Sequence, residues 1–529
     1  MLHRLRSLGF SVRVFEAGSG AGGTWFWNRY PGARCDIESM EYSYQFSEEL
    51  QQEWEWTERY ATQPEILKYI NYVADRFDLR RDIQFETRVD SMHFDDQTHR
   101  WTTETSDGQR VSSQYCVMAT GCLSSTNTPD FAGIDSFSGS RFHTGDWPHE
   151  GVDFGGQRVG VIGTGSSAIQ SIPLIAEQAA HLFVFQRTPN FSVPAHNAPL
   201  DPAFVMKTKA DYAGFRERNA SMPAGFGSAF PGNEGSALAV TDEERNTAFD
   251  ARWEKGGLQF LGAFGDLMIS REANDLAAEF VRGKISEAVD DPAIAEMLSP
   301  RQVVGCKRLC VDTGYYQTFN RPNVTLVDIS DATIDEITTD GLVANGKLYE
   351  LDAIVLATGF DAMTGALLAI DIRGRGGQTL QQKWSEGPRT YLGLSTFGFP
   401  NLFTVTGPGS PSVLSNMLPS IEQHVNWIAD CIEYLREHEI ANIEPTLEAE
   451  DQWVAVVNMI AGATLYPHCN SWYLGANVPG KPRVFMPFLG VPPYAERCRD
   501  VARNGYEGFA LTPRAGGAAA QSEAGEIAV

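Results

Sequence analysis

Short runs of apolar residues, each flanked by polar residues, mark the buried strands of this chain. Residues 11–16 read Ser-Val-Arg-Val-Phe-Glu, and the runs at 157–162 and 181–186 are rich in Val, Ile, Leu and Phe. Runs of this length and composition predict strands. Between the last two runs, Gly163-Thr-Gly165-Ser-Ser-Ala168 leads into a helical pattern that continues to Ala179. Strand, glycine turn, helix and strand in this order predict a dinucleotide-binding unit.

Two other regions have the apolar spacing of helices. Residues 196–300 contain long mixed stretches, of which 278–288 is the clearest, and predict a helical insertion. A second stripe recurs every three or four residues and predicts a helix with one face in an ordinary core. Its apolar positions are Ile421, Val425, Ile428, Ile432 and Leu435.

The repeated Ala-Thr-Gly at 119–121 and 357–359 predicts how these units are nested. Each Ala-Thr-Gly ends an apolar run, so each closes one nucleotide-binding unit. The predicted class is α/β, with two nested Rossmann-like domains. The predicted ranges are 1–135 with 365–512 for the first domain, 136–154 for a linker, 155–195 with 301–364 for the second domain, 196–300 for the helical insertion and 513–529 for a disordered tail.

Composition limits the classes of partner that the protein is expected to bind. The 529 residues carry a formal charge of −25, which argues against nucleic acid and anionic membrane as partners. No apolar run approaches the length of a membrane span, and the basic start lacks the apolar centre of a secretory signal. The eight cysteines form no Cys-x-x-Cys pair, so we expect reduced thiols, a cytoplasmic protein and no metal site.

The end of the second strand indicates which nicotinamide cofactor the second domain takes. A site for NAD usually has an acidic residue there, for the ribose hydroxyls. This chain has Gln186-Arg187-Thr188 instead. An arginine suits a 2′-phosphate, so the sequence favours NADPH. In the first domain, Glu16 ends the strand and suits a ribose without that phosphate.

Two motifs go beyond nucleotide binding. Residues 137–148 match FxGxxxHxxxW(P/D), from Phe137 to Pro148, and residues 22–36 match (A/G)GxWxxxx(F/Y)P(G/M)xxxD. With both motifs, the chain resembles the type I Baeyer–Villiger monooxygenases from Met1 to about Tyr494. Residues 30–39, 163–167 and 407–417 resemble the phenylacetone and steroid monooxygenase subgroup most closely.

The resemblance implies a reaction. Such enzymes use FAD, NADPH and O2 to convert a ketone into an ester or lactone through a flavin peroxide, with release of NADP and water. An aryl, steroidal or large cyclic ketone is implied here. The anionic intermediates need a permanent positive charge, which favours arginine. The resemblance assigns that charge to Arg308, its acidic partner to Asp36, and a contact with the NADPH phosphate to Lys307.

Further site residues come from the same motifs. His143 is expected to shape the linker and to take no part in proton transfer, and Trp472 matches a loop that covers the nicotinamide ribose. The implied cofactor contacts are Glu16, Thr24, Trp25, Phe26, Trp27, Arg34, Cys35, Asp36, Tyr42, Val89, Cys122, Gly163, Thr164, Gly165, Ser166, Ser167, Ala168, Gln170, Arg187, Thr188, Lys307, Arg308, Met417 and Trp472. The implied substrate pocket consists of Gln63, Pro64, Ser412, Val413 and Leu414.

The glycine turn of the first domain has no counterpart in the sequence. Gly163 and Arg187 are 24 positions apart, and the same interval counted back from Glu16 falls about eight positions before Met1. We therefore expect the first residues to lie in the helix that follows such a turn. We also expect the chain as written to hold FAD poorly or not at all.

Three alternatives stay open. The chain could be a truncated, non-catalytic protein that binds NADPH. It could be a flavin monooxygenase that oxidises amines or sulfides, although such enzymes lack the Lys-Arg pair. A disulfide reductase would need a redox cysteine pair, and Cys306 and Cys310 flank Lys307-Arg308 instead. If the chain is an enzyme, we expect a small-molecule ketone and O2 as its partners, and a monomer or weak oligomer.

Overall fold

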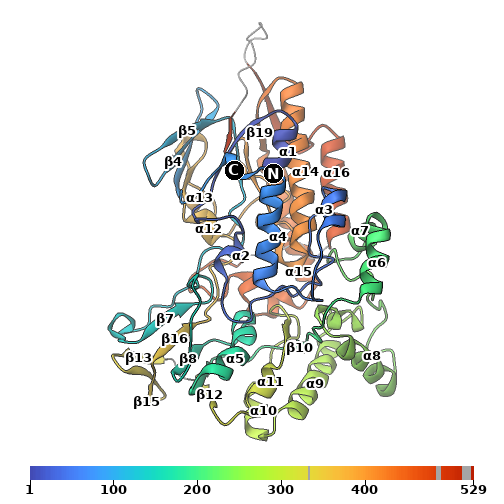
Figure 1. The fold of residues 1–529 in the computed structure, drawn as a ribbon. Coiled ribbons are helices and arrows are strands. Elements are labelled where there is room, and N and C mark those ends of the chain that lie inside the picture. The colour runs from blue at the N-terminus through green and yellow to red at the C-terminus, as the bar shows by residue number, and fades with distance from the viewer. Residues whose placement is uncertain (332–333, 484–489, 515–525, 529) are drawn as a thin grey trace.

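The computed structural model describes residues 1–331, 334–483, 490–514 and 526–528. Two parallel β-sheets, each of five strands, organise the chain into an upper and a lower part (Figure 1). The two chain ends lie side by side in the upper part. This arrangement confirms the predicted α/β class with two nucleotide-binding units.

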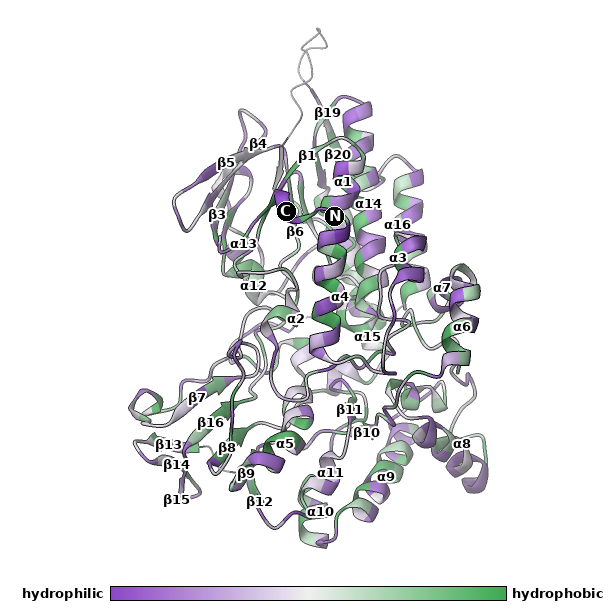
Figure 2. Cartoon of the chain, viewed as in Figure 1, coloured by the Kyte–Doolittle hydropathy of each residue, from purple (hydrophilic) through white to green (hydrophobic). Residues whose placement is uncertain are grey.

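The lower sheet contains the predicted strand–turn–helix–strand unit. Its order is β12-β9-β8-β16-β7, and every neighbouring pair is parallel. The strands are β7 (Ser140–His143), β8 (Arg158–Ile162), β9 (His181–Gln186), β12 (Val324–Asp328) and β16 (Ala353–Leu356). Helix α5 (Ser166–Gln178) follows β8 and buries Ile169, Ile172 and Ile175. Apolar residues colour β8, β9 and β16 green in Figure 2, as expected for a parallel sheet covered on both faces.

The edge strand of the lower sheet corrects one predicted boundary. Residues 136–154 were expected to be a linker, but Ser140–His143 pairs in parallel with β16 along its whole length. The outer edge of β16 would otherwise leave buried backbone groups unpaired, which is costly. The first half of this motif is therefore part of the lower sheet, and only the second half is a connection.

The upper sheet has the order β18-β6-β21-β1-β2, again parallel throughout. Its strands are β1 (Ser11–Phe15), β2 (Ile83–Gln84), β6 (Tyr115–Met118), β18 (Leu402–Thr404) and β21 (Glu526–Ala528). Helix α1 (Leu2–Ser7) precedes β1.

The central strand of the upper sheet comes from the far end of the chain. β21 pairs with β1 on one side and with β6 on the other, and holds the place that β8 holds in the lower sheet. The prediction of a disordered tail over 513–529 is therefore wrong for Glu526–Ala528, and Pro513 ends strand β20. Residues 515–525 and 529 lie outside the described residues. Backbone donors and acceptors on both sides of this position explain why a short segment pairs there.

The helical insertion is present where the sequence predicts it. Its helices are α6 (Pro202–Ala210), α7 (Tyr212–Ala220), α8 (Asp242–Lys255), α9 (Arg271–Ala288) and α10 (Pro292–Leu298). Thr241 and Glu244 form a capping box that starts α8. The buried face of α9, which includes Ala277, Val281 and Ile285, packs into the core of the lower sheet. Helices α8, α9 and α10 thereby become part of the lower half, whereas α6 and α7 pack in another cluster with Leu50 and Tyr69 of the upper half (Figure 1).

Smaller elements complete both halves. The antiparallel strands are β3 (Val89–Asp95), β4 (Arg100–Thr105) and β5 (Arg110–Ser113), extended in parallel by β17 (Asp371–Arg373); β13 (Ile334–Thr338), β14 (Gly341–Ala344) and β15 (Lys347–Glu350); and β19 (Ile440–Pro445) with β20 (Phe509–Pro513). A parallel pair consists of β10 (Ser192–Pro194) and β11 (Cys310–Asp312). The remaining α-helices are α2 (Thr24–Trp27), α3 (Glu48–Glu53), α4 (Gln63–Arg76), α11 (Tyr315–Thr318), α12 (Gly365–Leu368), α13 (Leu380–Lys383), α14 (Met417–Glu437), α15 (Leu447–Gly462) and α16 (Val491–Arg503).

Helix α14 confirms the predicted apolar stripe. Ile428, Ile432 and Leu435 are fully buried in the upper core. Within the part of the chain that the structure describes, no helix is both long and apolar enough to cross a bilayer.

Candidate active site

Arg308 and Asp36 form the ion pair that the sequence predicts. Arg308 Nε and Nη2 donate to the two carboxylate oxygens of Asp36 at 2.5 and 2.8 Å. Nη1 donates to the carbonyl of Val413 at 2.7 Å. About a fifth of each charged side chain is exposed. The guanidinium is therefore held in one orientation by two segments of the upper half, while its own segment leads into β11.

A residue that the sequence did not single out also contacts Arg308. The Tyr473 hydroxyl hydrogen-bonds to the guanidinium. Burial opposes the charge on Arg308, but Asp36 and Tyr473 outweigh burial and hold the pKa of Arg308 well above its ordinary value. Burial raises the pKa of Tyr473 to about 12 although Arg308 opposes the shift. Arg308 therefore keeps its charge at any working pH. The position of Tyr473 directly after Trp472 was the signal that could have identified it.

The loop that carries Asp36 is fastened to the lower half by Gln170 of α5. Tyr30 Oη donates to Gln170 Oε1 at 2.8 Å, and Gln170 Nε2 donates to the Arg34 carbonyl at 3.2 Å. Gly32 has φ +79°, and a Cβ there would lie 2.3 Å from the Gln170 carbonyl oxygen. Only glycine fits this approach. Gln170, expected to contact a cofactor, has both ends of its amide engaged with this loop.

In the glycine turn before α5, there is room for a Cβ at Gly165 but not at Gly163. Gly163 has φ +112°, and a Cβ there would lie 2.5 Å from the Ala357 carbonyl oxygen. A Cβ on Gly165, the N-cap of α5, would meet nothing within 4 Å. Ser166 hydrogen-bonds to Cys310 and Ser167 to Thr144. The turn and the free N–H groups of α5 fit a dinucleotide pyrophosphate.

Two cations lie together beyond this turn. Burial lowers the pKa of Lys307, and the nearby charge of Arg187 lowers it further. Neither residue has a salt-bridge partner among the described residues. Thr188 holds the turn through its carbonyl, which accepts from Thr164 Oγ1 at 2.8 Å. Two unneutralised cations at this position fit a 2′-phosphate.

The first nucleotide-binding unit holds its acidic residue at the end of β1. Glu16 Oε1 accepts from the Gly18 N–H at 2.7 Å. Helix α2 follows and carries Thr24 at its start, Phe26 buried at its centre, and Trp25, whose Nε1 donates to Tyr42 Oη at 3.1 Å. These residues fit the ribose and ring contacts of a second dinucleotide. No glycine turn follows β21 among the described residues.

The motif at residues 137–148 connects the upper and lower halves of the chain. His143 Nδ1 accepts from the Gly145 N–H at 2.9 Å, and burial lowers its pKa. The Trp147 N–H donates to the carbonyl of Trp27 at 3.3 Å, and His149 packs edge-on against Phe26 with ring centres 4.6 Å apart. Burial therefore favours the neutral form of His143, and its role in shaping the linker stays a prediction.

The remaining predicted site residues lie in or beside three different apolar clusters. Cys122, Val413, Leu414, Met417 and Trp472 share one apolar cluster beside Arg308. Ser412 begins the short 3₁₀ turn Ser412–Leu414 next to it. Val89, in contrast, starts β3 and packs with Phe15 in a different cluster. Cys35 is buried beside α4.

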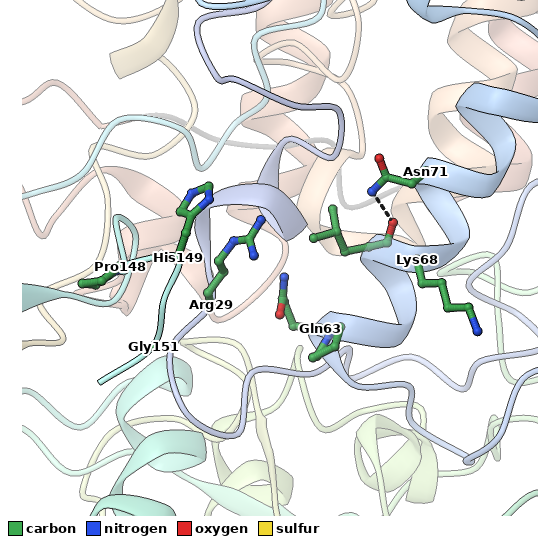
Figure 3. A pocket seen from close by; sticks show the side chains of 9 residues that line it. Arg29, Gln63, Lys68, Asn71, Pro148, His149 and Gly151 are labelled. Carbon is green, nitrogen blue, oxygen red and sulfur yellow. Dashed lines mark hydrogen bonds between the residues drawn. The ribbon is translucent and has the colours of Figure 1, made fainter. Parts of the chain in front are cut away.

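Of the predicted substrate-pocket residues, only Gln63 and Pro64 line the cavity beside α4. Gln63 and Pro64 begin α4 and line a cavity of about 440 Å³ together with Arg29, Lys68 and His149 (Figure 3). Ser412, Val413 and Leu414 are not among its lining residues. Gln63 Nε2 also donates to the Trp25 carbonyl at 2.5 Å.

One expectation about the cysteines is wrong. Cys306 and Cys469, 163 residues apart in sequence, form a disulfide with their Cα atoms 5.5 Å apart. The other six cysteines are free and buried. No sequence motif signals this bond, because the packing of two distant loops brings its cysteines together.

Comparisons with known proteins identify the family. A family model described as pyridine nucleotide-disulphide oxidoreductase matches residues 33–203. A Baeyer-Villiger monooxygenase from Pseudooceanicola batsensis is 44% identical over 510 residues, which cover 96% of this chain and 92% of that protein. The chain belongs to the Baeyer–Villiger monooxygenases.

Two other relatives are similar to this monooxygenase over nearly its whole length. The solved structure of an oxidized steroid monooxygenase bound to NADP has 54% identity, covers 97% of both chains and superposes with a TM-score of 0.92. Phenazine N-monooxygenase PhzNO1 from Lysobacter antibioticus is 42% identical, over 97% of this chain and 94% of that protein. FAD and NADP are bound in solved relatives. The cofactors of the monooxygenase are FAD and NADPH, and its reaction class is the oxygenation of a ketone.

Proposed function

We propose that this monooxygenase converts an aryl, steroidal or large cyclic ketone into an ester or lactone with NADPH and O2. The observation that carries the proposal is the ion pair of Arg308 and Asp36, which fixes a permanent cation beside an apolar cluster. The similarity to a steroid monooxygenase favours a bulky ketone. We further propose that the protein is cytoplasmic and a monomer or weak oligomer.

Arg308 stabilises negative charge that develops on oxygen. Arginine is suited to this role because its guanidinium does not lose its proton in proteins and presents several donors in one plane. The carboxylate of Asp36 and the Val413 carbonyl accept from Nε, Nη1 and Nη2, so these acceptors orient the guanidinium plane before the reaction begins. FAD, when bound and reduced by NADPH, would supply the electrons that activate O2. Preorganised donors of this kind contribute strongly to rate because they need no rearrangement.

The cofactor contacts are proposed from their positions. Glu16, Thr24, Trp25 and Tyr42 serve FAD, and Gln170 joins the two halves of the site. For NADPH, the turn from Gly163 to Ala168 serves the pyrophosphate, Arg187 and Lys307 serve the 2′-phosphate, and Trp472 serves as the cover. The substrate enters beside Ser412–Leu414, and Gln63 and Pro64 shape the entrance through Trp25.

The test separates NADPH oxidation from oxygen transfer. In Arg308→Ala, we expect ester formation to fall by at least about 100-fold while NADPH still reduces FAD. The released oxygen should appear as hydrogen peroxide. Arg301→Ala is the matched control, since Arg301 lies seven residues before Arg308 and forms an exposed ion pair with Glu296. Undiminished ester formation in Arg308→Ala would contradict the proposal.

A second candidate is oxidation of a ring nitrogen, which the phenazine-oxidising relative favours. A panel of aryl ketones, steroid ketones, phenazine and a thioether, with products identified by mass spectrometry, distinguishes the two. We expect esters from ketones and a lower yield of N-oxide. The intact Arg308–Asp36 pair and the near full-length similarity favour either enzyme over a non-catalytic NADPH-binding protein.

A further inference from the structure

The disulfide lies at the entrance to the catalytic segment. Cys306 directly precedes Lys307-Arg308, and Cys469 directly precedes residues 470–481, which we name the cover loop. The cover loop carries Trp472 and Tyr473 in the 3₁₀ turn Trp472–Leu474. The disulfide therefore links Cys469, at the start of the cover loop, covalently to Cys306, which lies two residues before Arg308.

The Cys306 side of this bond is rigid. Asn274 of α9, which is fully buried, accepts from the Val304 N–H at 2.8 Å and donates to the Val304 carbonyl at 3.0 Å. The Cys306 N–H in turn donates to the Val303 carbonyl at 3.2 Å. Because helix α9 belongs to the lower core, the disulfide uses that core as its anchor (Figure 1).

The other anchors of the cover loop are non-covalent. Lys481 forms a salt bridge with Asp361 and donates to the Ala362 carbonyl at 2.6 Å. Asn477 Nδ2 donates to the Phe360 carbonyl at 2.7 Å. With Tyr473 on Arg308, these contacts hold the middle and the end of the loop. The disulfide holds the start of the loop covalently. A loop held by non-covalent contacts alone opens more often than one that also has a covalent link.

We propose that Cys306 and Cys469 are a reversible oxidation site that sets how firmly the cover loop closes. The bonded form keeps the start of the loop fixed, and the dithiol form releases it. The consequence for NADP⁺ rests on the proposed contact of Trp472 with the nicotinamide cofactor. The bond and its effect on the loop do not depend on that contact.

The oxidation balances with hydrogen peroxide, which flavin monooxygenases release when oxygen transfer fails. Each thiol gives up one proton and one electron, the S–S bond forms, the O–O bond of the peroxide breaks, and two water molecules leave. A small dithiol reverses the step by exchange through a mixed disulfide and is itself oxidised to a cyclic disulfide.

Because both sulfurs are buried, the rate at which they are reduced depends on how often the cover loop opens. Cys306 and Cys469 are only 2% and 5% exposed, so a reductant reaches the sulfurs when the cover loop opens. Linkage then requires reciprocity: if the disulfide strengthens closure over NADP⁺, NADP⁺ slows reduction of the disulfide.

The first experiment measures the bond and the loop without any ketone. Peptide mapping after alkylation, with and without dithiothreitol, reports the disulfide, and hydrogen exchange reports the amides of residues 470–481. We expect exchange of these amides to be several-fold faster after reduction, and equally fast in Cys306→Ser/Cys469→Ser under both conditions. Cys498→Ser, which removes a free buried cysteine of α16, should respond to reduction like the parent.

The second experiment measures NADP⁺. We expect NADP⁺ to dissociate several-fold faster from the reduced form, and saturating NADP⁺ to slow reduction by a similar factor. Free thiols at both positions after peroxide treatment would overturn the proposal, as would identical amide exchange in the two forms. If exchange changes while NADP⁺ release does not, the oxidation site stands and the proposed contact of Trp472 with NADPH fails.

Discussion

The carboxylate of Asp36 accepts two hydrogen bonds from the guanidinium of Arg308 across 272 positions of the chain. Asp36→Asn keeps the size of the side chain and removes its charge. We expect ester formation to slow by about 10- to 100-fold, as for other residues that orient a catalytic group. NADPH oxidation should change little, so peroxide release should rise relative to ester. Product and peroxide assays check this; a variant with unchanged coupling would contradict the positioning role of Asp36.

Gly163 and Gly165 should fail in different ways when changed to alanine. Gly163→Ala places a Cβ against the Ala357 carbonyl at a φ that alanine avoids, so we expect a loss of about 2–4 kcal/mol of stability. Gly165→Ala meets open space, so stability should stay unchanged while NADPH binds at least about 10-fold more weakly. Thermal unfolding and NADP⁺ titration separate the two effects. Equal affinity in Gly165→Ala would argue against a pyrophosphate at this turn.

Lys307 should make NADPH binding depend on pH. Burial and Arg187 lower its pKa, and a bound phosphate raises that pKa again because it carries the opposite charge. Binding therefore takes up a proton, and affinity falls as pH rises from about 7 to about 10. NADP⁺ affinity measured across this range should decline in the parent and stay nearly flat in Lys307→Met. NAD⁺, which lacks the phosphate, should show the flat profile in both proteins.

His424 should reduce stability in mild acid. Its Nδ1 accepts from the Thr406 N–H at 2.9 Å, and its Nε2 lies 2.9 Å from Tyr494 Oη, which donates to the Leu392 carbonyl. Burial lowers the pKa of His424 to about 3. Since the unfolded chain takes up the proton near pH 6.5 and the folded chain does not, stability is full above that pH and falls below it. The expected loss is about 2 kcal/mol at about pH 5.

His424→Asn provides the comparison. Asparagine offers the Thr406 N–H an acceptor but does not titrate, so the variant should start less stable and lose less stability between about pH 7 and pH 5. Thermal or urea unfolding at each pH measures the difference between the two proteins. Parallel curves would rule out His424 as the origin.

Strand β21 should support the first nucleotide-binding unit. Ile527 pairs with Val12 on one side and with Tyr115 on the other. Ile527→Pro removes a backbone donor from the centre of this sheet, whereas Ile527→Val keeps it. We expect the proline variant to unfold at a lower temperature and to retain less FAD after gel filtration. The absorbance ratio of flavin to protein measures this.

Much of the site follows from local sequence. The turn from Gly163 to Ala168, the motif at 22–36 and the Lys307-Arg308 pair each encode a local conformation or a charge, and the structure places them where those properties predict. The ion pair of Arg308 with Asp36 was predicted because the chemistry requires a partner for the cation. Tyr473 was missed because its position directly after Trp472 places it on the expected loop but does not show whether its hydroxyl faces Arg308 or packs in a core.

The sequence by itself determined the strands, the glycine turns, the helical insertion and the charged pair, because these depend on neighbours a few positions away. Only the tertiary structure decided which segments become neighbours. It placed Glu526–Ala528 between β1 and β6, engaged Gln170 with the loop before Asp36, and joined Cys306 to Cys469. Such pairings depend on sheet order and on the packing of loops that are 136 or more residues apart. Many different partners would satisfy the same local pattern of polar and apolar residues.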